Sequence, residues 1–184
     1  MKEAPLQRDL GFLVFPAGPA DAEDLARVHV AAWRESYRGL LPDGFLARMS
    51  EPAHARRFAR LLRAPPKDAV TLVVADRGGI VGYAEGGPSR SGAAGEAEIA
   101  TLYLLRAAQG RGLGRRLLEG AARAMAANGA ASLAISVLRD NLTARGFYEH
   151  LGGVADPPRR ERGPGGALVQ EVTYRWADIG SLFP

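Results

Sequence analysis

The residues with the clearest chemical potential form a turn of alternating glycine and arginine, Gln109-Gly110-Arg111-Gly112-Leu113-Gly114-Arg115-Arg116. An apolar pattern with helical spacing begins directly after this turn, at Leu117. The first backbone N–H groups of a helix have no partner and carry partial positive charge, so a preceding glycine-rich turn can surround a phosphate group with its amides. The arginines add full positive charges. The turn therefore predicts a site for a phosphate-containing ligand.

The spacing of the glycines separates several kinds of nucleotide site. A Walker loop requires Lys followed by Ser or Thr at its end, whereas Gly114 is followed by Arg115 and Arg116. A dinucleotide fingerprint requires a glycine three positions after its second glycine, and here Gly112 is followed at that distance by Arg115. We therefore expect neither ATP hydrolysis nor dinucleotide binding. The pattern that fits is QxxGxG, with Gln109 as its first residue.

Hydrophobic patterns on both sides of the turn predict alternating strands and helices. Strands are expected over residues 13–15, 70–75, 80–85, 98–104, 133–137 and 168–176, with a further one near Val154. Helices are expected from Asp21 to about Gly39, over 52–62, from Leu113 to about Asn128, and from Asn141 to His150. Residues 86–95 are rich in Gly, Ser and Ala and are expected to form a loop. This order predicts a mixed α/β sheet.

Length and composition indicate one globular domain over residues 1–184, because 47% of the residues are hydrophobic and 24% are charged. No apolar run approaches the roughly 20 residues that span a bilayer, and residues 1–10 are too polar for a signal peptide. The chain has no cysteine, and its three histidines lack metal-ligand spacing. We expect a cytoplasmic protein without a membrane contact and without a metal.

The net charge of +4 raises the question of an acidic partner such as nucleic acid. The arginines are, however, scattered along the chain, and no RNA-binding or zinc-finger signature accompanies them. Solvated surface charge is the simpler interpretation. We therefore expect no nucleic acid partner, and a steep salt dependence of DNA or RNA binding would favour that alternative.

The QxxGxG turn and its flanking elements resemble the GNAT superfamily of N-acetyltransferases. The strand 98–104, the turn, the helix with Leu117, the strand 133–137 and the segment Asn141-x-x-Ala144-x-x-Phe147-Tyr148-x-x-x-Gly152 match it in order and spacing. The match covers about residues 96–153, and residues 33–42 also look like the amino-terminal part of many such enzymes. The resemblance implies a mixed, mostly antiparallel central sheet with a splayed strand pair and helices on both faces.

For the acyl donor, the resemblance implies acetyl-CoA as co-substrate, with its pantetheine arm between the two splayed strands. Backbone groups of Leu102, Tyr103 and Leu104 would bind this arm like an additional strand. The pyrophosphate would lie on the turn, with Gln109 at the edge and contacts from Gly110, Arg111, Gly112, Leu113, Gly114 and Arg115. The alternative is a helix-capping turn that binds no ligand.

For catalysis, the resemblance implies that Tyr148 protonates the departing thiolate, since a phenol and a thiol have similar pKa values. Without the family match Tyr148 would be ordinary aromatic core, the role we expect for Phe147. Glu98 is the candidate to deprotonate the amine, with Glu96 as its substitute; surface acids are the alternative. Asn141 is expected to contact the pantetheine arm, to cap the following helix, or both.

The acceptor side is less defined by the sequence. Trp33 and Tyr37 are candidates to line an acceptor pocket, with core packing as the alternative. Many relatives carry an aromatic residue where this chain has Gly153, so packing at the end of the last predicted helix is expected to differ.

The resulting expectation is transfer of acetyl to a primary amine on a small molecule, a peptide or a protein N-terminus, by direct attack in a ternary complex. The alternative is a non-catalytic acyl-CoA sensor or interaction module with the same fold. The sequence leaves the oligomeric state open, with a homodimer among the alternatives.

Overall fold

The computed structural model of the chain describes residues 11–183. The first ten residues, for which the sequence predicts no signal peptide, lie outside this range, and the single domain expected over 1–184 stays a prediction. Within the described residues, none of the helices has the length and apolar character needed to cross a membrane.

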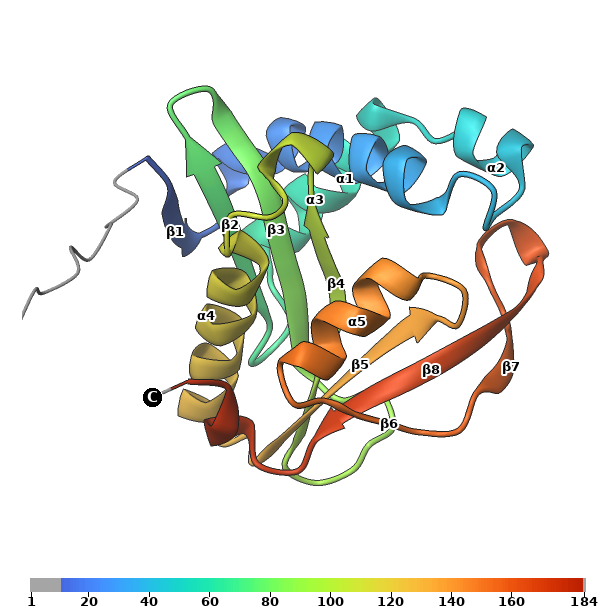
Figure 1. Ribbon diagram of the computed structural model, residues 1–184. Helices are drawn as coiled ribbons and strands as arrows, with labels where there is room; N and C mark the ends of the chain where they lie inside the picture. Colours follow the sequence, from blue (N-terminus) through green and yellow to red (C-terminus); the bar gives the residue numbers. More distant parts are fainter. Residues whose placement is uncertain (1–10, 184) are drawn as a thin grey trace, which may run out of the picture.

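Across residues 11–183, eight strands form one sheet and five α-helices pack around it (Figure 1). The helices are α1 (Ala22–Tyr37), α2 (Asp43–Ala47), α3 (Glu51–Arg63), α4 (Leu113–Ala127) and α5 (Leu142–His150). The strands are β1 (Leu13–Pro16), β2 (Val70–Asp76), β3 (Gly79–Pro88), β4 (Glu96–Leu104), β5 (Ser132–Leu138), β6 (Val154–Ala155), β7 (Arg159–Arg162) and β8 (Leu168–Trp176). Short 3-10 turns are η1 (Pro19–Asp21), η2 (Arg106–Ala108), η3 (Pro164–Gly166) and η4 (Ile179–Leu182).

The strand order is β1-β2-β3-β4-β5-β8-β6, and β7 pairs with β8. Neighbouring strands are antiparallel except for β4 and β5, which run parallel. A pair of parallel strands requires a crossover connection, and α4 provides the connection between β4 and β5. The expected mixed, mostly antiparallel sheet is therefore confirmed.

Strands β4 and β5 pair only along their first halves. Their register runs from Glu96 opposite Ser132 to Ile99 opposite Ile135 and ends there. Beyond this point β4 continues to Leu104 beside β3, while β5 continues beside β8. Figure 1 shows the two strands diverging, so within residues 11–183 the second half of β4 has no strand partner on the side of β5. The splayed pair is confirmed.

A β-bulge marks the point where this divergence begins. Glu85 of β3 lies opposite Thr101, and Gly86 lies opposite Ile99, so Ala100 is an extra residue in β4. Gly86 must be glycine here, because a Cβ atom would lie 2.3 Å from the carbonyl oxygen of Glu98. The bulge changes the direction in which the β4 side chains beyond Ile99 point.

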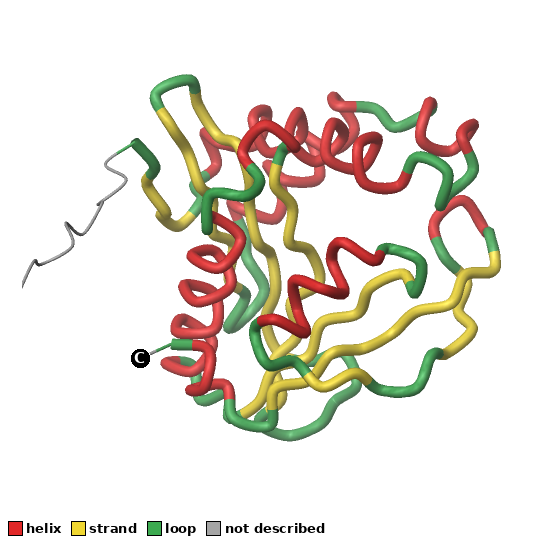
Figure 2. The backbone as a smooth tube through the Cα atoms, in the orientation of Figure 1, coloured by secondary structure: helices red, strands yellow, loops and turns green. Residues whose placement is uncertain are grey.

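Helices cover both faces of the sheet (Figure 2). On one face, called the α4 face, Leu117 and Leu118 of α4 and Tyr148 of α5 pack in one core with Ile99 and Ile135. On the opposite face, called the α1 face, helices α1 and α3 form a second core against β2 and β3, with Leu25, Val28, Phe58, Val73 and Tyr83 buried. The predicted helices on both faces are confirmed.

Three local predictions need correction. Strand β3 extends to Pro88, so the loop expected over 86–95 is shorter. The sequence analysis missed α2, a single turn anchored by the buried Leu46, and assigned no element to the Pro/Arg/Gly-rich segment that contains β7. The β7–β8 hairpin reaches α2, where a Cβ atom on Gly165 would lie 3.1 Å from Phe45. These elements depend on contacts between distant parts of the chain.

Candidate functional site

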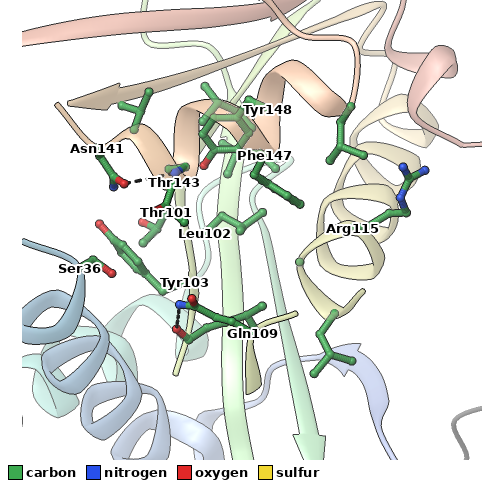
Figure 3. Close-up of a pocket in the computed structure, with 18 of the residues that line it drawn as sticks. Ser36, Thr101, Leu102, Tyr103, Gln109, Arg115, Asn141, Thr143, Phe147 and Tyr148 are labelled. Atoms are coloured by element: carbon green, nitrogen blue, oxygen red, sulfur yellow. Dashed lines mark hydrogen bonds between the residues drawn. The ribbon is translucent and has the colours of Figure 1, made fainter. Parts of the chain in front are cut away.

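A cavity of about 610 Å³ occupies the space between the diverging strands. Its walls come from the end of α1, from β4 and β5, from the glycine turn and from α5. Figure 3 shows Asn141, Phe147 and Tyr148 of α5 facing Thr101 and Leu102 of β4 across this space.

Most of the predicted site residues line this cavity: Tyr37, Leu102, Tyr103, Leu104, Gln109, Gly110, Gly112, Leu113, Gly114, Arg115, Asn141 and Tyr148. Three predicted residues, Trp33, Glu98 and Arg111, are not part of its wall. Segments that are distant in the sequence thus converge on one space.

The glycine turn presents a row of free backbone amides to the cavity. Gly110 and Gly112 have φ values of 72° and 73°, in the left-handed region that favours glycine. Helix α4 begins after Gly112 without a side-chain cap, and no backbone hydrogen bond within residues 11–183 uses the N–H groups of residues 110–115. Unpaired amides at a helix N-terminus are suited to binding a phosphate group.

Two further contacts fix the shape of the turn. Gln109 donates a hydrogen bond of 3.2 Å from Nε2 to the carbonyl oxygen of Leu104, which ties the turn to the end of β4. Gly114 lies against Phe147, because a Cβ atom there would be 3.2 Å from the ring. Gly114, the third glycine of the turn, therefore lets α4 and α5 approach each other.

The arginines near the turn differ in what they contact. Arg106 and Arg115 line the cavity, and Arg115 lies 3.6 Å from Glu119 on the exposed surface of α4. Arg116 donates to the carbonyl oxygen of Phe12, and Arg111 lies over the ring of the same phenylalanine. Arg106 and Arg115 therefore provide positive charge to the cavity wall.

Asn141 is the N-cap of α5, which is one of the two roles predicted for it. Its Oδ1 accepts a hydrogen bond of 3.2 Å from the backbone N–H of Ala144. The same side chain lines the cavity beside Thr143, a residue that the sequence analysis did not select. The cap is confirmed, and a contact with a bound ligand stays a prediction.

Tyr148 extends from α5 toward the start of the gap between the strands. Its ring is 5% exposed and packs among Phe147, Tyr174 and Trp176. Figure 3 shows the hydroxyl directed into the cavity. Burial, and then the neighbouring Tyr37, raise the pKa of Tyr148 well above its ordinary value. The phenol therefore keeps its proton and can act as a donor.

A pair of tyrosines closes the cavity on the side of α1. Tyr37 and Tyr103 share a hydrogen bond of 2.8 Å between their hydroxyl groups. Trp33 packs behind Tyr37, with 5.0 Å between the ring centres, and belongs to a cluster with Leu41, Leu46 and Leu138. Of the two candidates for the acceptor pocket, Tyr37 therefore lines the cavity and Trp33 supports it from the core.

The two candidate bases are held by different partners on the sheet. Burial alone would raise the pKa of Glu98, but hydrogen bonds from the side chain and the amide of Arg90 lower it below the ordinary value. Glu96 accepts a hydrogen bond of 2.8 Å from Ser89 and forms an ion pair with Arg175 of β8. Glu96 is thus part of a network that joins β4 to β8.

Several residues of the site had no signal in the sequence. Ala100 forms the bulge, and Glu35, Ser36, Arg106 and Ser136 line the cavity. Thr143 lies inside the segment that begins at Asn141, and Glu35 and Ser36 lie inside residues 33–42, but the motifs did not single out these residues. Within residues 11–183, no group of three His, Cys, Asp or Glu side chains is arranged to hold a metal ion.

Comparisons with known proteins agree with this geometry. Residues 22–153 match the acetyltransferase (GNAT) family. The uncharacterised N-acetyltransferase YuaI of Bacillus subtilis is 28% identical over 167 residues, which cover 88% of this chain and 91% of YuaI.

Two solved structures show the similarity of the fold. The PaiA N-acetyltransferase of Thermoplasma acidophilum, in complex with coenzyme A, has a TM-score of 0.65 and 20% identity over 88% of this chain and 98% of its own. A ribosomal-protein-alanine N-acetyltransferase from Brucella melitensis has a TM-score of 0.71 and 20% identity, covering 89% and 98% of the two chains. With the family match across most of its length, the chain belongs to the GNAT acetyltransferases and is an N-acetyltransferase by class.

Proposed function

We propose that the protein transfers an acetyl group from acetyl-CoA to a primary amine by direct attack in a ternary complex. The observation that carries this proposal is the row of unpaired amides at residues 110–115, which opens on the cavity between β4 and β5. A donor with a phosphate-rich end and a long polar arm fits a site with this order of groups.

The residues of the cavity suit acetyl-CoA along its length. The free amides and the nearby Arg115 hold the pyrophosphate, since both provide positive charge at the N-terminus of α4. The edge of residues 100–103 that faces β5 binds the amide groups of the pantetheine arm in the manner of an added strand. Similarity to the fold of PaiA, which was solved with coenzyme A, supports this placement.

Tyr148 then lies on the wall where the thioester sulfur is expected. Its phenol donates a proton to the sulfur as the carbon–sulfur bond breaks, which avoids release of a free thiolate. The amine enters from the α1 face, past Tyr37, and a carboxylate on that face accepts its proton. The sequence predicts Glu98 as the carboxylate that deprotonates the amine.

The acceptor class is a primary amine on a small molecule, a peptide or a protein N-terminus. The similarity to a protein named as a ribosomal-protein-alanine N-acetyltransferase supports the peptide and protein members of this class. The tyrosine pair and the short helix α2 form the surroundings that an acceptor would meet.

The test is to incubate the protein with acetyl-CoA and a panel of primary amines that includes peptides with free N-termini, and to follow release of free thiol. We expect amine-dependent thiol release and acetylated product by mass spectrometry. Binding of acetyl-CoA without thiol release from any amine would contradict the enzyme and favour an acyl-CoA sensor.

A further inference from the structure

Glu171 of β8 is a carboxylate on the α1 face that the sequence analysis did not select. Its cross-strand partner is Leu138, and Val169 lies two residues before it. Leu138 and Val169 both pack in the cluster that contains Tyr37 and Trp33. Because paired residues and alternate residues of a strand share a face, the Glu171 side chain lies on the same face as Tyr37.

Glu171 differs from its acidic neighbours in having no ionic partner. On the α1 face, Glu85 pairs with Arg57, and Glu98 pairs with Arg90, which also donates to it from its backbone N–H. Among residues 11–183, no salt bridge involves Glu171. Its carboxylate is partly buried and, like that of Glu98, lies outside the wall of the cavity.

The charged groups around Glu171 adjust its proton affinity. Burial raises the pKa of Glu171 above its ordinary value, and Glu161 of β7 and Glu98 of β4 raise it further, against the opposing effect of Arg90. Arg159 of β7 lies opposite Glu171 in the register but is exposed. Burial raises the pKa of Tyr37 on the cavity wall, the hydrogen bond with Tyr103 opposes this shift, and the charge of Glu171 adds a smaller increase. A carboxylate with a raised pKa is a better match for an amine proton than one with a lowered pKa.

We propose that Glu171, rather than Glu98, accepts the proton of the acceptor ammonium group through intervening water; this rests on the proposed function. The freed nitrogen lone pair forms the bond to the acetyl carbon, and the carbon–sulfur bond breaks. Tyr148 gives its proton to sulfur and regains one from the acylated nitrogen. Glu171 passes its proton to solvent, so one proton is released for each acetyl group transferred.

In this arrangement Arg90 and Glu98 are positioning residues. Arg90 lies within electrostatic range of both carboxylates and holds Glu98 through its guanidinium group. Glu98 keeps this positive charge paired, so that Arg90 does not neutralise Glu171. We therefore expect the general base to be Glu171 on β8 and the positioning carboxylate to be Glu98 on β4.

The first test is Glu171→Gln, with the kcat of thiol release measured between pH 5 and pH 9 with a peptide or small amine that the wild type acetylates. We expect kcat to fall by about 10²-fold or more, as for loss of a general base. The acidic limb of the pH profile should also disappear, whereas the affinity for acetyl-CoA should stay unchanged by calorimetry. An unchanged kcat and an unchanged acidic limb would overturn the assignment.

Two matched variants separate a base from a merely structural residue. Glu161→Gln and Glu98→Gln each remove a negative charge that raises the pKa of Glu171, so each should move the acidic limb to lower pH without abolishing it. Loss of the limb in Glu98→Gln with its retention in Glu171→Gln would identify Glu98 as the base. If the wild type itself released no thiol with any amine, the proposed function would fail before this inference was tested.

Discussion

Gly112 lies in the glycine turn and is the residue immediately before α4. Its φ of 73° is costly for any residue with a Cβ atom, and within residues 11–183 no atom beyond the adjoining backbone lies within 4 Å of where that atom would be. Open space beside free amides is what a bound phosphate would need. Gly129, at the other end of the same helix, has a φ of 93° and equally open surroundings.

This pair of glycines gives a controlled test of the turn. Gly112→Val and Gly129→Val should each destabilise the fold by roughly 1–2 kcal/mol through backbone strain, measured by urea unfolding. Only Gly112→Val should also lose binding of acetyl-CoA in calorimetry, because its side chain occupies the phosphate space. Normal affinity in Gly112→Val would refute the assignment of the turn.

The role of the Tyr148 hydroxyl as proton donor can be tested by a single substitution. Tyr148→Phe removes the hydroxyl and keeps the ring among its aromatic neighbours, so the fold should be preserved. We expect kcat to fall by about 10²-fold or more, with a much smaller change in acetyl-CoA affinity. Equal kcat values for the variant and the wild type would exclude Tyr148 as the proton donor.

Residues inside short motifs could be predicted from the sequence, whereas residues joined only by the fold could not. Gln109, Gly112, Asn141 and Tyr148 stand in motifs whose spacing is readable along the chain, and all four line the cavity. Glu171 has no such context, because its position on the same face of the sheet as Tyr37 results from the pairing of β8 with β5.

At the scale of elements, the site depends on the divergence of β4 and β5. Hydrophobic alternation predicted both strands, but it carries no information on where their pairing ends. The end of pairing coincides with the bulge at Ala100, which shifts the register of β4 against β3. Helix α2 and strand β7 were missed because both are short and are held by contacts distant in sequence.

The packing of α1 against α3 and β3 makes a prediction about pH. His29 of α1 is 7% exposed and shares a hydrogen bond of 2.6 Å with the Tyr83 hydroxyl. Burial first, and then the charges of His54 and Arg57, lower the pKa of His29 from 6.5 to about 3. The unfolded chain therefore binds more protons than the folded chain as the pH falls below 6.5, and stability is lost in that range.

Between pH 7 and pH 5 this single residue should cost about 2 kcal/mol of unfolding free energy. His29→Gln removes the titrating group, so the loss of stability between these pH values should be smaller by that amount. Urea unfolding of both proteins at pH 7 and pH 5 measures the difference. Parallel pH dependences would show that His29 does not remain neutral in the folded protein.

At the scale of the whole molecule, the sheet separates two sets of groups that meet at one gap. The glycine turn, α4 and α5 belong to the α4 face, whereas Tyr37, which lines the cavity, and Glu171, which lies outside its wall, belong to the α1 face. The β7–β8 hairpin extends to α2 and borders the α1 face (Figure 1). A donor and an acceptor can therefore approach the same point from opposite sides, as direct transfer requires.

The proposed function depends on binding of the acyl donor's pyrophosphate by the amides of residues 110–115. The most direct measurement is a crystal structure of the protein grown with coenzyme A. We predict pyrophosphate oxygens about 2.9 Å from these backbone nitrogens, with the pantetheine arm between β4 and β5. Coenzyme A bound elsewhere, with the turn empty or blocked by protein side chains, would contradict the account.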